Sequence, residues 1–210
     1  MGLIRLAGTN SGQSAASFPS GRAAGGWEDR LTITTPDVTL NGKPGTLSFA
    51  VAVHAVLQSE GEAGGARFII DYFKNNQQSF LPGGFSGAKE WRISTFPKPD
   101  VNKTSRVVDE IVHFSVGFNF GTSFDLGIFA LASAGMRGQT FSSLNVSTAS
   151  VDAMNTVRWM GVTGVQAGAT AITDFTIVSA ANVDWLQPTP VPLPAGLPLL
   201  GAALCVLPLA

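Results

Sequence analysis

The feature that most constrains the fold of this chain is a period-two pattern of apolar residues over two long stretches. In TLSFAVAVHAVLQ, residues 46–58, an apolar side chain occupies every second position from Leu47 to Leu57. The pattern recurs in IVHFSVGFNF, residues 111–120, where Val, Phe, Val, Phe and Phe alternate with mostly polar residues. Successive side chains of a strand point to opposite faces, so this period predicts two long β-strands, each with one buried face, the second of which starts at Val107.

Shorter stretches of the same kind predict further strands, and no stretch before residue 190 has the pattern of a helix. Charged residues make up only 13% of the sequence, about half of the ~25% typical of soluble proteins, and 24 glycines supply turns. Strands separated by turns rather than by helical crossovers predict an all-β protein, an antiparallel β-sandwich that is jelly-roll-like. The further strands are expected at 31–35, 66–73, 90–96, 123–134, 141–151, 155–162 and 171–179.

Neighbouring strands are predicted to pair as hairpins. The loop SEGEAGG joins 46–58 to 66–73, and a short turn at Gly121 joins 111–120 to 123–134. Short connections of this kind are typical of antiparallel neighbours in one sheet.

The 210 residues suffice for one domain with extensions at its ends. Residues 1–26, rich in Gly, Ala and Ser, are predicted to be a flexible leader, and 27–186 the β-sandwich. Residues 187–194 are expected to form a Pro-rich linker. Residues 195–210 are expected to form a hydrophobic C-terminal helix.

Two histidines are the first candidates for a metal site. His54 and His113 lie on the polar faces of the two long predicted strands, and Asp71 or Asp109 could supply a third ligand. The sequence lacks the HxH and HExxH spacings that place two histidines on one metal. We therefore expect solvent-facing residues here and no metal.

Calcium is a second possibility, because Asp100, Asn102 and Asp125 offer the oxygen ligands that this ion prefers. The EF-hand spacing is absent, and Asp and Asn are also ordinary turn residues. No cofactor is expected.

Catalytic signals are weak. The stretch GGFSGA around Ser86 fails the G-x-S-x-G pattern, and the paired carboxylates Glu28–Asp29 and Asp109–Glu110 are sequence neighbours that would point to opposite faces of a sheet. Residues 72, 91 and 159, one Tyr and two Trp, could stack on sugars, although such residues in strands are usually core. The 13 Lys and Arg are scattered, which argues against nucleic acid. The expected protein is not an enzyme.

The last 20 residues, VPLPAGLPLLGAALCVLPLA, carry no charge. The prolines at 192, 194 and 198 forbid a regular helix through the first part. About 16 residues from Ala195 onward give roughly 24 Å of helix, short of the ~30 Å hydrocarbon core of a bilayer.

The order of these parts resembles the PEP-CTERM class of bacterial sorting signals, in its VPLPA variant. The motif stands here as Val191, Pro192, Leu193, Pro194 and Ala195, followed by GLPLL. The resemblance implies an exported substrate of exosortase, a membrane protease that recognises the motif. It implies transient anchoring in the inner membrane by the C-terminal helix, then release to the cell surface or an exopolysaccharide matrix, as in biofilms.

Two features of the family are not found in this sequence, namely an N-terminal signal peptide and a C-terminal cluster of Arg or Lys. We therefore expect the gene to extend beyond the printed sequence. The leading expectation is a non-enzymatic exported protein. The alternatives are a carbohydrate-binding module and a polysaccharide-acting lyase or hydrolase on a β-sandwich.

Overall fold

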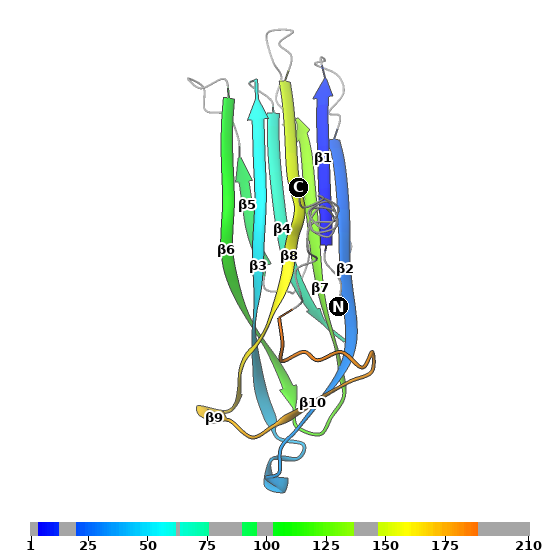
Figure 1. Cartoon of the computed structure of the whole chain (residues 1–210), viewed down its shortest axis with the longest axis vertical. Coiled ribbons are helices and arrows are strands. Elements are labelled where there is room, and N and C mark those ends of the chain that lie inside the picture. The colour runs from blue at the N-terminus through cyan, green and yellow to red at the C-terminus, as the bar shows by residue number, and fades with distance from the viewer. Residues whose placement is uncertain are drawn as a thin grey trace, which may run out of the picture.

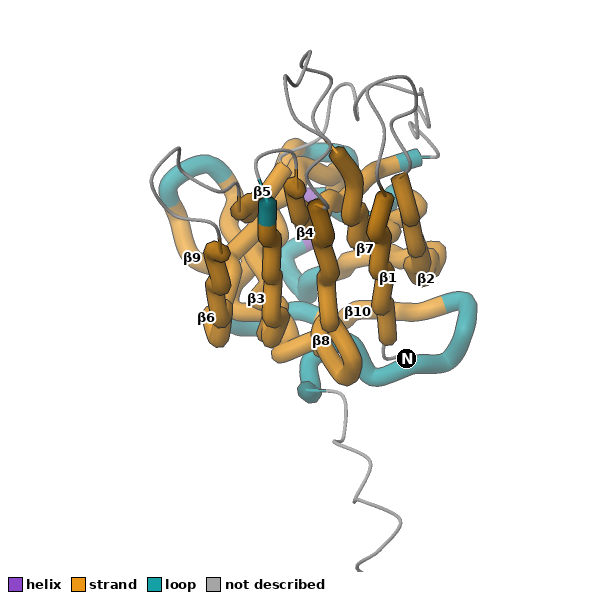
Figure 2. Tube along the Cα trace, turned by 90° about the horizontal axis from the view of Figure 1, so that it is seen from above, coloured by secondary structure: helices purple, strands orange, loops and turns teal. Residues whose placement is uncertain are grey.

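The computed structural model describes residues 4–12, 20–61, 64–75, 90–95, 103–136 and 147–188. Over these residues the chain is all-β and forms two antiparallel sheets that lie against each other as two layers (Figure 1, Figure 2). The strands are β1 (Ile4–Gly12), β2 (Ser20–Thr34), β3 (Pro44–Glu60), β4 (Gly64–Lys74), β5 (Glu90–Thr95), β6 (Lys103–Asn119), β7 (Phe124–Met136), β8 (Ser147–Ala167), β9 (Thr170–Ile172) and β10 (Thr176–Ser179), with one 3-10 turn, η1 (Val38–Leu40).

The strands pair in a nested order. The first sheet runs β1-β8-β3-β6, with β9 beside β8, and the second runs β10-β2-β7-β4-β5. Strand β1 pairs with β8, β2 with β7, β3 with β6, and β4 with β5. The strands β1 to β4 thus pair in reverse order with β5 to β8, as in one long hairpin, and the paired strands are divided between the two sheets.

Both predicted hairpins are wrong. Strand β3 pairs with β6 and β8 in the first sheet, while β4 lies in the second. Likewise β6 is in the first sheet, and β7 pairs with β2 and β4 in the second. The connections after Glu60 and after Asn119 cross between the layers. The apolar face of a strand is buried in the same core whether the next strand of the chain pairs with it or lies in the opposite sheet. The alternation of apolar residues therefore could not distinguish these two arrangements.

The predicted buried faces of the two long strands are confirmed. Every second residue of β3 from Leu47 to Leu57 is buried, and so are the matching residues of β6 from Val112 to Phe118. Between the sheets, the Phe49 ring packs against the rings of Phe114 and Trp159 at centroid distances of 5.6 and 5.1 Å. This aromatic layer forms the centre of the core.

One polar bond joins the layers through this core. Tyr72 of β4 packs edge-on against Phe49 with ring centroids 5.7 Å apart, and its hydroxyl donates to the Ser115 carbonyl of β6 at 2.5 Å. The bond satisfies a phenol that would otherwise be buried without a partner.

Strand boundaries differ from the sequence prediction at several points. Pairing starts ahead of residue 27, because β1 and the first part of β2 fall within the stretch expected to be a leader. There the small residues of β2 face equally small ones of β7, with Ala23 opposite Ala132 and Gly21 opposite Ala134. The two strands expected at 141–151 and 155–162 are one long β8 in the part described, and the one expected at 171–179 is split into β9 and β10.

The predicted helix at 195–210 and the motif at 191–195 lie outside the described residues. Within the part that is described, no helix has the length and apolar character needed to cross a membrane.

Candidate functional site: the clasp ahead of the C-terminal tail

A carboxylate lies at a core position in the middle of β2. Asp29 occupies the same face of the strand as Leu31 and Ile33, which are fully buried, and is itself only 8% exposed. Charge at such a position is costly unless several donors surround it. Its bonding partners therefore indicate what the residue does.

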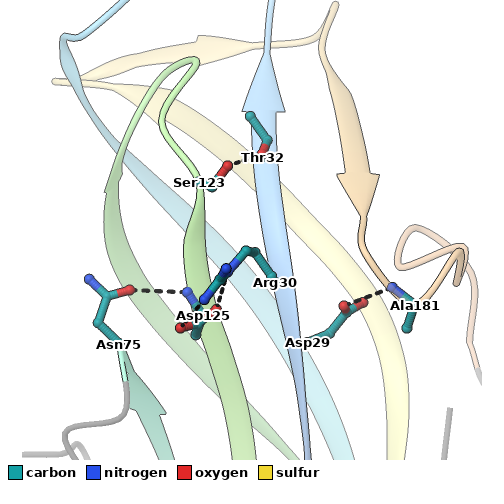
Figure 3. Close-up of polar contacts among 7 residues, drawn as sticks. All are labelled: Asp29, Arg30, Thr32, Asn75, Ser123, Asp125 and Ala181. Atoms are coloured by element: carbon teal, nitrogen blue, oxygen red, sulfur yellow. Dashed lines mark hydrogen bonds and ion pairs between the residues drawn. The ribbon is translucent and has the colours of Figure 1, made fainter.

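The described donors are Ser179, the last residue of β10, and two residues of the segment that follows it. The Asp29 carboxylate accepts hydrogen bonds from Ser179 Oγ at 2.5 Å, from the Ala181 amide at 3.1 Å and from Trp185 Nε1 at 2.8 Å. Figure 3 shows the contact from Asp29 on β2 to Ala181 on this segment. A second layer of bonding supports the first, since Ser179 Oγ also accepts from the Val183 amide at 3.0 Å.

Trp185 links the segment to the first sheet through contacts with Trp159 of β8. Its ring is 2% exposed and meets Trp159 of β8 edge-on, with centroids 4.7 Å apart and planes at 77°. Trp159 Nε1 donates to the Trp185 carbonyl at 2.9 Å. Both indole N–H groups thus have partners, as buried indoles require.

Gly161 makes room for the same segment. Its φ is +99°, which L side chains rarely adopt, and a Cβ added there would lie 2.6 Å from the Leu186 carbonyl oxygen. Only glycine therefore lets residue 186 lie directly on β8. We call these residues the C-terminal clasp: Asp29, Trp159, Gly161, Ser179, Ala181 and Trp185. The clasp joins the end of the described chain to both sheets.

The neighbour of Asp29 points the other way and forms a surface ion pair (Figure 3). Arg30 Nε donates to Asp125 Oδ1 at 2.7 Å, and its Nη2 donates to Oδ2 at 3.2 Å. This guanidinium lowers the pKa of the Asp125 carboxyl below its ordinary value through the hydrogen bond and, to a smaller extent, through charge. Asn75 Oδ1 also accepts from the Asp125 amide at 3.0 Å. Arg30 thus already pairs with the one predicted calcium ligand that is described.

The histidine candidates do not converge. Asp109 faces His54 across β3 and β6 with Nδ1 and Oδ1 3.9 Å apart, and both side chains are exposed. His113 faces Ala50, four residues along the strand from His54, which is about 13 Å. Asp71 is buried in the opposite sheet. In the described ranges, no three His, Cys, Asp or Glu side chains gather as metal ligands would.

The aromatic candidates are core residues where their side chains are described. Tyr72 and Trp159 lie between the sheets. Trp91 lies in β5, with its backbone opposite Ile70. The remaining candidates, Ser86, Asp100, Asn102 and the motif Val191–Ala195, fall outside the described residues.

Asp29 was considered in the sequence only as half of a carboxylate pair. A signal was present, because Asp29 stands two positions before Leu31, the start of the predicted strand at 31–35, and so continues its alternation on the side of Leu31 and Ile33. As predicted, Glu28 and Asp29 point to opposite faces, with Glu28 exposed and Asp29 buried. With hydrogen bonds from two side chains and one backbone amide of residues 179–185, the Asp29 carboxylate is placed to hold this part of the chain against β2.

Comparison of the sequence with protein-family models and with curated proteins found no match.

Proposed function

We propose that the chain is an exported, non-enzymatic protein of the cell surface or extracellular matrix, whose C-terminal tail is an exosortase sorting signal. The motif would be Val191, Pro192, Leu193, Pro194 and Ala195. One structural observation carries the proposal beyond sequence resemblance. The clasp fastens the chain up to Trp185, and the exposed Leu186, Gln187 and Pro188 lead directly into the motif.

This arrangement suits a cargo whose tail is cut. Trp185 is the last buried residue in the described chain, and its bonds to Asp29 and Trp159 do not involve the tail. Cleavage near Pro194–Ala195 would then leave every strand pairing of the body in place. Seven residue steps from Pro188 to Ala195 span at most about 25 Å, so the protease would work close to the folded body.

The partners follow from the same proposal. They are a membrane-embedded exosortase, the inner membrane through residues 195–210, and exopolysaccharide around the released protein. No cofactor and no nucleic acid enter the proposal. We also propose that the sandwich is a jelly roll. The nested pairing supports this, with β1 beside β8, β2 beside β7, β3 beside β6 and β4 beside β5.

A structural role for the body is favoured over the two alternatives. A sugar-binding module would present aromatic rings on a flat face, whereas the large exposed apolar side chains of the described part are all aliphatic: Val38, Val107, Ile111, Val178 and Leu186. A lyase would bring His, Tyr and a basic group into one groove. Here Tyr72 is in the core and His54 is on the outer face of the first sheet.

The test is the mature C-terminus. The gene, with its upstream and downstream codons, would be expressed in a bacterium that has an exosortase and in a matched strain lacking it, and the released protein would be analysed by mass spectrometry. We expect a terminus near Pro194 only in the first strain. A Pro192→Ala/Pro194→Ala variant should stay uncut, and Pro188→Ala, outside the motif, should be processed normally. A released protein that retains residues 191–210 would refute the proposal.

A further inference from the structure

Strand β6 is a long edge. It runs for 17 residues at the end of the first sheet and, among the described strands, pairs only with β3. Every second residue of such a strand directs its N–H and C=O groups away from the sheet. The carbonyls of Ser115 and Gly117 already accept hydrogen bonds from Tyr72 and Lys74, so the template on which another strand can pair is the part of β6 before them, residues 103–113.

The apolar character of β6 adds to this. Val107 and Ile111 point away from the core and are 64% and 57% exposed. On β3, Val56 faces Val107 and Ala52 faces Ile111. The outer face therefore carries an apolar strip at the edge, where proteins that avoid association usually place charges.

The charges of β6 divide into two groups. Lys103 Nζ lies 4.0 Å from Glu60 Oε2, and Asp109 Oδ1 lies 3.9 Å from His54 Nδ1. Both of these charged residues of β6 therefore have partners on β3. Arg106 and Glu110 are exposed, lie on the same face of the strand on either side of Val108, and have no ion-pair partner among the described residues. One positive and one negative charge thus stand equally far from a central apolar residue.

We propose that β6 pairs antiparallel with β6 of a second copy of the chain, around a two-fold axis at Val108. In this register Arg106 faces Glu110 of the second copy, and the pair occurs twice by symmetry. The two first sheets join into one continuous sheet. We take the occupant of the edge to be a second copy, because Arg106 and Glu110 are placed symmetrically about Val108 and therefore complement each other when the strand pairs with itself in reverse.

Other registers fit less well. Residues that face each other across strands share a face, so the two-fold axis must pass at a residue rather than between two residues. An axis at Arg106 would pair Lys103 with Asp109, but it would place the two Arg106 side chains opposite each other. The axis at Val108 is the register that gives Arg106 an acidic partner on its own face.

The test is charge reversal and exchange, measured by sedimentation of the full chain over a range of concentrations. We expect a monomer–dimer equilibrium. Arg106→Glu and Glu110→Arg should each weaken it about tenfold or more, since each turns two attractive pairs into two repulsive ones. The double variant Arg106→Glu/Glu110→Arg should restore it. Asp174→Arg, a reversal in the exposed turn between β9 and β10, is the matched control and should leave it unchanged.

Hydrogen exchange provides a second readout that does not depend on the variants. Amides along residues 103–113 should become better protected as concentration rises, while those of β10 should not change. A chain that stays monomeric at every concentration overturns the proposal. So does association that ignores both single reversals, which would assign it to another surface such as the apolar tail. A double variant no stronger than the single ones overturns the register.

Discussion

Replacement of Asp29 by alanine tests whether the clasp fastens the end of the body. The substitution removes the acceptor for Ser179 Oγ, the Ala181 amide and Trp185 Nε1. Trp185 is 2% exposed, so water cannot replace the lost partner, and stranding its N–H costs about 1–3 kcal/mol. The other two donors lie nearer to solvent, and each loses about 0.5–1.5 kcal/mol.

The sum is a loss of roughly 2–6 kcal/mol in the free energy of unfolding, a large part of the ~5–15 kcal/mol of a typical domain. Urea denaturation would measure it, with tryptophan fluorescence reporting on the clasp and circular dichroism on the sheets. Asp29→Asn keeps one acceptor oxygen and should fall between wild type and Asp29→Ala. Glu28→Ala, at the exposed neighbouring position, should stay within ~0.5 kcal/mol of wild type.

Limited proteolysis adds the spatial part of the test. Asp29→Ala should open the chain to cleavage between Ser179 and Leu186 before the sheets unfold, because the bonds lost all hold that segment. If Asp29→Ala were as stable as Glu28→Ala, and the segment as resistant to protease, the reasoning about the clasp would be wrong.

Three further predictions concern the clasp, the core and the surface. Gly161→Ala should cost about 2–4 kcal/mol in urea denaturation, because its φ of +99° and its closeness to residue 186 leave no place for a Cβ, whereas Gly164→Ala, with open space around it, should be nearly neutral. Burial raises the pKa of Tyr72 above its ordinary value of 10.0, so the stability it contributes is complete below pH 10 and is lost as the pH rises through the higher pKa of the folded state. Because Tyr72 is the one tyrosine of the chain, tyrosinate absorbance measures this directly; equal titration of folded and urea-unfolded protein would contradict the prediction. The hydrogen bond from Arg30 lowers the pKa of Asp125 below its ordinary value of 3.8. The small contribution of this surface pair to the free energy of unfolding is therefore present above pH 3.8 and is lost as the pH falls through the lower pKa of the folded state. Arg30→Gln should reduce this loss of stability at acid pH, as measured by urea denaturation over a series of pH values.

The candidate site was only partly predictable. The resemblance is the ground on which we propose that the tail is a sorting signal. It said nothing of how the tail is joined to the body, since the clasp connects residues about 150 positions apart, as Asp29 and Ala181 show. A lone Asp within an apolar alternation marks a position that needs donors, but the sequence does not say which donors reach it.

The local features of this protein follow from its sequence alone. The period-two pattern fixed the buried faces of β3 and β6, because the direction of a side chain along a strand depends only on its neighbours in the chain. It also fixed the all-β class. The tertiary structure decided which strands are neighbours, and it placed β3 beside β6 rather than β4. A period of two describes one strand at a time, whereas strand pairing depends on contacts between residues far apart in sequence. The alternation of apolar residues is the same whether β3 pairs with β4 or with β6, so it does not distinguish the two arrangements.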